Sequence, residues 1–300
     1  MKGLLGGIEA GGTKFVCAVG RGPDDYRAEV RFPTTTPDET IARAVAFFKE
    51  QAEIEPIDAI GIASFGPVDL NPHSLTYGYI TTTPKAGWQE IDLLGRVKAA
   101  LGLPAAFDTD VNAAALAEYR WSGAALRDVD PLVYMTIGTG IGIGVIANGQ
   151  PVHGLVHPEG GHMLLRHDRT RDPFDGCCPY HGDCFEGLAS GPAMHKRWGE
   201  AAESLPIHHP AWDLEAQYIA EGLMNIIYVL SPRRIVLGGG VMQQQHLFPV
   251  IREKVLAMLN KYVDSDLLLE TPEHYIVPAS MGNRVGTVGA FALAEKALKA

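Results

Sequence analysis

This sequence of 300 residues lacks the features that place a protein in a membrane or on a nucleic acid. No apolar run approaches the ~18 residues that a membrane-spanning helix needs, and no secretory leader precedes the first strand-like segment. The net charge of −10 leaves no basic stripe for a phosphate backbone. We therefore expect a cytoplasmic protein that binds neither membranes nor nucleic acids.

Cysteine is also scarce, with four in the whole chain. A disulfide framework is not expected in the cytoplasm, where thiols remain reduced. Cys17 alternates with Phe15 and Val19 in a strand-like segment, which is typical of a small core side chain. The other three cysteines fall close together between residues 177 and 184, with His181 among them.

The spacing of these residues favours a metal site. Cys178, His181 and Cys184 are each three residues apart, and Gly182 gives the loop the backbone freedom to fold around one ion. His162 is the natural fourth ligand, and two thiolates with two imidazoles suit tetrahedral zinc. A disulfide or simply buried thiols remain as alternatives, but neither requires a histidine among the cysteines.

Length and pattern predict an α/β chain with two lobes built on one plan. With 46% apolar residues, the chain is long enough for two cores of ordinary size. Residues 4–19 and 132–147 each form two apolar strands around a turn of glycine and threonine. We expect a first lobe at 1–117, a second lobe with the metal loop at 118–284, and a final helix at about 285–300 that packs back on the first.

The two glycine turns can hold phosphate, because such turns bring backbone N–H groups close to an anion. Ordinary hairpin turns would explain them equally well. Neither is a Walker loop or a dinucleotide fingerprint, since a strand rather than a helix follows each one. One turn in each half therefore suggests a nucleotide held by both. The candidate residues are Gly11, Gly12, Thr13 and Lys14 in the first turn, and Thr139 and Gly140 in the second.

Asp110 follows a short strand at 105–107 and begins an alanine-rich helix. An aspartate here can be a helix cap, which the helix dipole favours. It can also be a general base, because ligands bind at strand ends in α/β lobes. Trp88 lies in a loop that precedes this region in the chain, and it also allows two interpretations. Its ring can stack on a sugar, or it can pack in the core.

Six segments follow one another along the chain: 8–14 (IEAGGTK), 110–115 (DVNAAA), 137–140 (IGTG), 159–162 (EGGH), 178–184 (CPYHGDC) and 238–240 (GGG). In this order they resemble the ROK family of bacterial sugar kinases and repressors, and most closely its ATP-dependent fructokinases. The resemblance runs nearly end to end.

The resemblance implies a two-lobed actin/hexokinase-like (ribonuclease H-like) sugar kinase fold with its active site in the cleft. It also implies Mg²⁺ and ATP, a structural zinc ion and a homodimer. The expected reaction is phosphorylation of a hexose, in the first place fructose to fructose 6-phosphate; mannose, glucose and N-acetylmannosamine are the alternative substrates. A sugar-responsive repressor is a remote alternative, because those relatives carry an N-terminal DNA-binding extension, and here Met1 stands just before the first strand.

Individual roles follow from the same resemblance. Asp110 matches the catalytic base, and Glu159, His162 and Glu186 join it in binding the sugar. The metal ligands are His162, Cys178, His181 and Cys184. The nucleotide residues are Gly11, Gly12, Thr13, Lys14, Thr139, Gly140, Pro192, Gly238, Gly239, Gly240, Val241 and Met242.

Three positions depart from the family pattern. Many relatives have aspartate where Glu9 stands and asparagine where Thr109 stands. Their metal loop also carries a third cysteine in place of one imidazole. Cys177 and Cys178 are therefore both candidate ligands, and the even spacing selects Cys178.

Overall fold

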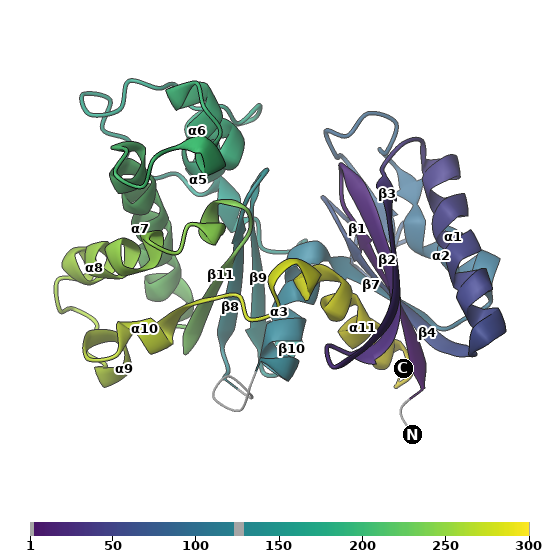
Figure 1. Cartoon of the computed structure of the whole chain (residues 1–300). Helices are drawn as coiled ribbons and strands as arrows, with labels where there is room; N and C mark the ends of the chain where they lie inside the picture. The colour runs from purple at the N-terminus through teal and green to yellow at the C-terminus, as the bar shows by residue number, and fades with distance from the viewer. Residues whose placement is uncertain (1–2, 123–128, 300) are drawn as a thin grey trace. The chain divides into compact units, whose positions relative to one another are not determined.

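The computed structural model describes residues 3–122 and 129–299, which form two compact α/β units (Figure 1). The first unit comprises Met1–Asp128, Gln150–His157 and Ser280–Ala300, and the second comprises Val129–Gly149 and Pro158–Ala279. The predicted α/β class is confirmed. The predicted boundary between the two lobes, after residue 117, stays a prediction.

The first unit is built on a mixed sheet with the strand order β3-β2-β1-β4-β7. β1 and β2 form the predicted antiparallel hairpin, and β4 and β7 continue the sheet parallel to β1. The parallel strands therefore end at one edge of the sheet. The strands are β1 (Leu4–Ala10), β2 (Lys14–Gly22), β3 (Asp25–Pro33), β4 (Ile57–Ser64) and β7 (Ala105–Thr109), with a separate small ladder of β5 (Tyr79–Ile80) and β6 (Ile91–Asp92).

Helices cover both faces of this sheet (Figure 1). α1 (Pro37–Ile54) and α2 (Leu93–Leu101) bury a core that contains Phe15 and Phe48. α3 (Asp110–Trp121) and α11 (Val285–Ala297) lie on the other face. There, a Cβ atom added to Gly289 would lie 2.2 Å from the carbonyl oxygen of Ala113, so the glycine is required for the two helices to approach this closely.

Trp88 is a core residue. Its side chain is completely buried, and its ring lies 5.5 Å from that of Phe15 and 5.7 Å from that of Phe65. The indole Nε1 donates a hydrogen bond to the carbonyl oxygen of Thr35, so the one polar atom of the ring is satisfied. Of the two interpretations of Trp88, packing is therefore correct.

The second unit repeats the plan of the first, with the strand order β10-β9-β8-β11-β12. β8 and β9 form an antiparallel hairpin, and β11 and β12 continue the sheet in parallel. Its elements are β8 (Leu132–Ile137), β9 (Ile141–Ala147), α5 (Phe185–Ala189), α6 (Gly191–Trp198), α7 (Ala211–Leu230), β11 (Arg234–Gly238), α8 (Leu247–Leu259), α9 (Asp266–Leu269), α10 (Pro272–Tyr275) and β12 (Ile276–Pro278). The sheet also includes β10 (Gln150–Pro151), which lies in a segment counted with the first unit.

The long helices of the second unit are amphipathic or buried elements of its core. α7 and α8 lie side by side, and Ile219 and Leu223 of α7 are fully buried. Within residues 3–122 and 129–299, no helix is both long and apolar enough to cross a membrane.

Candidate active site and metal cluster

The four predicted metal ligands come together in the second unit. One ligand atom from each of His162, Cys178, His181 and Cys184 lies within 4.8 Å of all the others. Cys178 Sγ is 3.8 Å from Nδ1 of both His162 and His181, and Cys184 Sγ is 3.6 Å from His162 Nδ1. Tetrahedral zinc with ordinary bond lengths places sulfur and nitrogen ligands ~3.6 Å apart. The cluster therefore has the dimensions that zinc requires.

Backbone hydrogen bonds shape the loop around this cluster. Cys178 and Gly182 exchange N–H···O bonds of 3.1 and 3.0 Å, and Gly182 has a φ of +63°, which favours glycine. Phe185 N donates to the carbonyl oxygen of Met163, which holds the segment after His162 against Cys184. Cys177 lies outside the cluster, and all four cysteines of the chain are free thiols.

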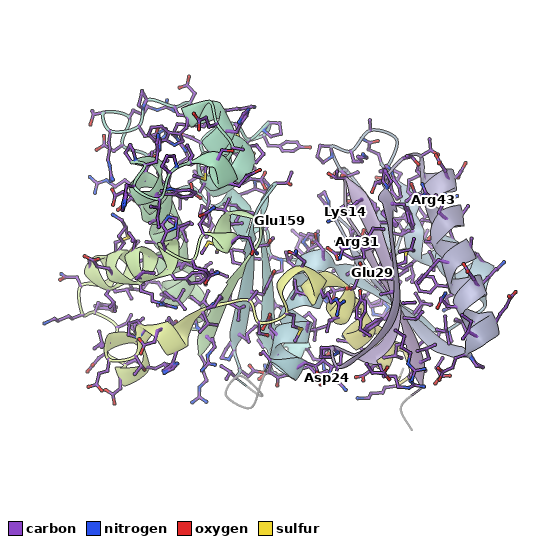
Figure 2. The ribbon with its side chains drawn as sticks, in the orientation of Figure 1. Lys14, Asp24, Glu29, Arg31, Arg43 and Glu159 are labelled. Atoms are coloured by element: carbon purple, nitrogen blue, oxygen red, sulfur yellow. The ribbon has the colours of Figure 1, made fainter. Side chains whose placement is uncertain are left out.

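The carboxylate of Glu186 lies against the second glycine turn. Its Oε2 accepts a hydrogen bond from the N–H of Ile141 at 3.0 Å. A Cβ atom at position 140 would lie 2.6 Å from the same oxygen, so Gly140 leaves the space that Glu186 occupies. Glu159 is exposed at the start of the short turn Gly160–His162 (Figure 2). Both predicted sugar-binding glutamates therefore flank the metal cluster in sequence.

Three glycine segments of the second unit converge, as expected for a nucleotide site. The carbonyl oxygen of Gly138 accepts from the N–H of Gly191 at 2.8 Å, next to Pro192. Gly239 has a φ of +92°, and a Cβ there would lie 2.4 Å from the carbonyl oxygen of Ile137. Thr139 is exposed on its turn, whereas Val241 and Met242 are buried, so these two offer only backbone.

The first unit presents its own glycine turn at the end of β1. Gly11 N donates to the carbonyl oxygen of Lys14 at 3.0 Å, and Thr34 Oγ1 donates to the carbonyl oxygen of Gly11 at 2.6 Å. No atom lies within 4 Å of the Cβ position of Gly12, so space is open there. Thr13 and Lys14 are exposed, and their side chains are available to a phosphate (Figure 2).

Asp110 is the first residue of α3 rather than its cap. The cap is Thr109, whose Oγ1 accepts from Asn112 N at 3.1 Å. Thr109 therefore serves the helix at the position where many relatives have asparagine. Burial raises the pKa of the Asp110 carboxyl to about 6, although hydrogen bonds from backbone N–H groups, including Val111 N at 2.9 Å, act in the opposite direction.

Glu9 is a second perturbed carboxyl, at the end of β1. Burial, followed by repulsion from Asp110, raises its pKa to about 7, while Lys14 and Arg31 lower it. A Cβ atom at position 286 would lie 2.4 Å from the carboxyl carbon of Glu9. Gly286 therefore makes room for the glutamate, a relationship that sequence spacing could not reveal because the two residues lie at opposite ends of the chain.

The contacts that hold the residues just before Asp110 were also not predicted from the sequence. Asp108 is almost fully buried and accepts from Asn112 Nδ2 at 2.7 Å, and its other oxygen lies 2.9 Å from His153 Nε2. These contacts fix the start of α3. His153 is far from Asp108 in the sequence, so no local pattern could have predicted the pair.

The two α/β units share one strand order, and each has a glycine turn in its first hairpin, which is the plan of an actin-like fold. The crystal structure of the ROK hexokinase from Thermus thermophilus has this fold: the TM-score is 0.79, with 23% sequence identity and 99% of each chain covered. The predicted two-lobed, actin/hexokinase-like architecture is confirmed.

The chain belongs to the ROK family, whose sequence profile matches residues 5–297. It is 47% identical to the fructokinase of Pediococcus pentosaceus over 296 residues, covering 99% of both chains. It is also 44% identical to the fructokinase of Lactococcus lactis subsp. cremoris over 294 residues, covering 98% of both. The predicted family is confirmed along nearly the whole sequence.

We expect protein purified without added metal to carry about one zinc ion per chain, because four matched ligands close the site. Atomic absorption of the wild type and two serine variants tests this. Cys178→Ser should lose most of the metal, whereas Cys177→Ser, its neighbour outside the cluster, should retain it. Equal zinc content in the two variants would contradict the ligand assignment.

Proposed function

We propose that this protein is an ATP-dependent fructokinase, which transfers the γ-phosphoryl group of ATP to the 6-hydroxyl of D-fructose. The observation that carries the proposal is the identity of 47% and 44% to fructokinases over nearly the full length of the chain. The products are ADP, fructose 6-phosphate and a proton. The glycine turns, the carboxyls and the metal cluster are the groups that such a transfer needs.

Asp110 is the proposed general base. Phosphoryl transfer depends chiefly on alignment and charge neutralisation, and on a group that accepts the proton of the attacking hydroxyl. Asp110 directly follows β7, and its pKa of about 6 leaves it ionised at neutral pH yet able to accept a proton. Mg²⁺ bound with ATP would supply charge neutralisation at the phosphates, and Glu9, whose pKa the charge of Asp110 helps to raise, is a second carboxyl in this region.

The metal cluster supports sugar binding in this proposal. Nδ1 of His162 faces Cys178 and Cys184, so its Nε2 is the nitrogen left to face a sugar hydroxyl. Glu159 and Glu186 would accept from further hydroxyls. Zinc with four protein ligands has no open coordination position, so its contribution is to hold the loop rather than to activate water.

The nucleotide is assigned mainly to backbone groups. Residues 11–14 and the segment Thr139–Gly140 would hold phosphates, and Pro192 with residues 238–242 would hold the adenosine. These segments offer mainly N–H groups and open space, which suits a ligand that lies against backbone. The homodimer and the cytoplasmic location remain predictions.

Relative kcat/KM values with ATP, for fructose, mannose, glucose and N-acetylmannosamine, test the substrate. Fructose should be preferred by at least about tenfold, since a few pocket contacts typically give discrimination of this size. A higher kcat/KM for any of the other three sugars would replace fructose with that sugar, and no turnover of any sugar would reject the kinase.

Asp110→Asn should keep the fold and ATP binding while lowering kcat by roughly 10²–10⁴-fold, the usual contribution of a general base. Asp24→Asn, an exposed aspartate of the same unit, is the matched control and should behave as wild type (Figure 2). A coupled phosphorylation assay and ATP titration give both quantities. Near wild-type turnover in Asp110→Asn would rule out the base assignment.

A further inference from the structure

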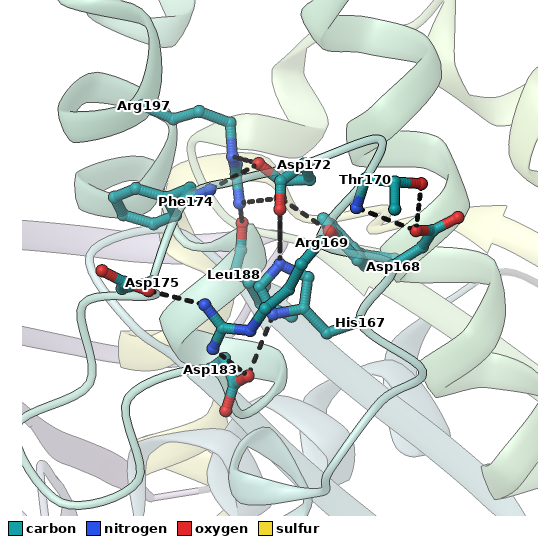
Figure 3. Close-up of polar contacts among 11 residues, drawn as sticks. His167, Asp168, Arg169, Thr170, Asp172, Phe174, Asp175, Asp183, Leu188 and Arg197 are labelled. Carbon is teal, nitrogen blue, oxygen red and sulfur yellow. Dashed lines mark hydrogen bonds and ion pairs between the residues drawn. The ribbon is translucent and has the colours of Figure 1, made fainter.

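A buried polar network lies beside the metal loop in the second unit (Figure 3). It joins residues of the preceding segment, the loop itself and the helices α5, α6 and α7. The exposed fractions of the His167, Asp172 and Arg197 side chains are 5%, 2% and 7%, so charged groups are held here out of water. Burial of charge on this scale is tolerated only when each group has partners.

His167 lies at the centre of the network and contacts an acceptor with each ring nitrogen. Its Nδ1 is 2.9 Å from Asp183 Oδ2, and its Nε2 is 2.9 Å from the carbonyl oxygen of Asp172. His167 therefore links the Asp183 side chain to the backbone of Asp172 through its two ring nitrogens (Figure 3).

Asp172 and Arg197 extend this link. Asp172 Oδ2 accepts from Tyr218 OH at 2.6 Å and lies 3.0 Å from an Arg197 terminal nitrogen, and its Oδ1 accepts from Arg197 Nε at 3.1 Å. The same arginine donates to the carbonyl oxygen of Leu188 at 2.8 Å. The network is therefore anchored on α7 through Tyr218 and on α6 through Arg197.

This network contacts the chain both before and after one of the metal ligands. Asp183 directly precedes Cys184, and Leu188 lies in α5, the helix that follows it. Arg169 adds a second bond to Asp183, at 3.0 Å, from the surface. Between these anchors lie Cys184 and Glu186, so their backbone positions are set from both sides.

We propose that His167 is a positioning residue for the metal loop: through Asp183 it holds Cys184 where the zinc ion needs its thiolate. The proposal rests on the zinc site proposed above. Loss of the His167 bond would leave the Asp183 side chain bonded to the half-exposed Arg169 and would weaken the hold on the residue before Cys184. Partners that orient ligands in this way typically change metal affinity by 10- to 100-fold when removed.

Zinc release to a chromophoric chelator measures the effect without reference to catalysis. His167→Gln, whose amide has a single nitrogen and cannot reproduce the contacts of both ring nitrogens, should release zinc roughly 10- to 100-fold faster than wild type. His274→Gln, an exposed histidine of the same unit, is the matched control and should release zinc at the wild-type rate. Absence of zinc from the wild type would reject the metal site, and with it this role of His167.

Asp183→Ala provides a second variant should His167→Gln fail to fold, because the Asp183 side chain is 32% exposed and its truncation leaves no buried cavity. It should also release zinc faster, and the double variant should be no faster than the faster single one, since both remove one link. Zinc release within twofold of wild type in every folded variant, even with a lower melting temperature, would show a purely structural network and overturn the proposal.

Discussion

The burial of two carboxyls, Glu9 and Asp110, is the main physical constraint in the first unit, because it raises the pKa of both. Glu9 lies near the carboxyl end of β1 and Asp110 directly follows β7, and repulsion from Asp110 adds to the effect of burial on Glu9. A carboxyl whose pKa is higher in the folded chain lowers stability as pH rises above its unfolded value. The fold holds both groups because Asp110 accepts backbone hydrogen bonds and Gly286 leaves room for Glu9. The raised pKa values lower the stability of the folded chain at neutral pH, and a carboxyl with a raised pKa can accept a proton more readily at that pH.

The constraint in the second unit is different: several ligand groups must be held in place on a loop that buries few of its own side chains. Hydrogen bonds between Cys178 and Gly182 close the loop, and the four ligand atoms gather at the spacing of a tetrahedral ion. Glu186 then connects this region to the glycine turn through the N–H of Ile141. A displacement of Cys184 would therefore also shift a proposed sugar contact and a proposed phosphate-binding turn.

Much of this architecture could be predicted from the sequence, because the hairpins and buried helices carry clear apolar periodicity. β3 was not predicted: it is an edge strand in which exposed charged residues such as Arg27 and Glu29 alternate with half-buried side chains. Such a strand has no continuous apolar signal. The even spacing of Cys178 selected the cysteine that lies in the cluster, because local spacing and loop geometry coincide there.

The contacts that the sequence could not reveal join distant residues. His167 and Asp183, or Glu9 and Gly286, meet only because the strands and helices bring them together. Local chemistry was also ambiguous where two explanations used the same residue type. Asp110 could have been a helix cap until Thr109 was seen to fill that role.

The pH dependence of kcat/KM for fructose phosphorylation tests the central claim, that Asp110 accepts the substrate proton, most directly. Because burial raises the pKa of Asp110 to about 6 in the free protein, kcat/KM should be level above neutral pH and fall about tenfold per pH unit well below 6. Glu9→Gln should keep this acid limb, since the limb belongs to Asp110. A kcat/KM that stays constant from pH 5 to 8 in the wild type, or an acid limb that disappears in Glu9→Gln, would contradict the assignment.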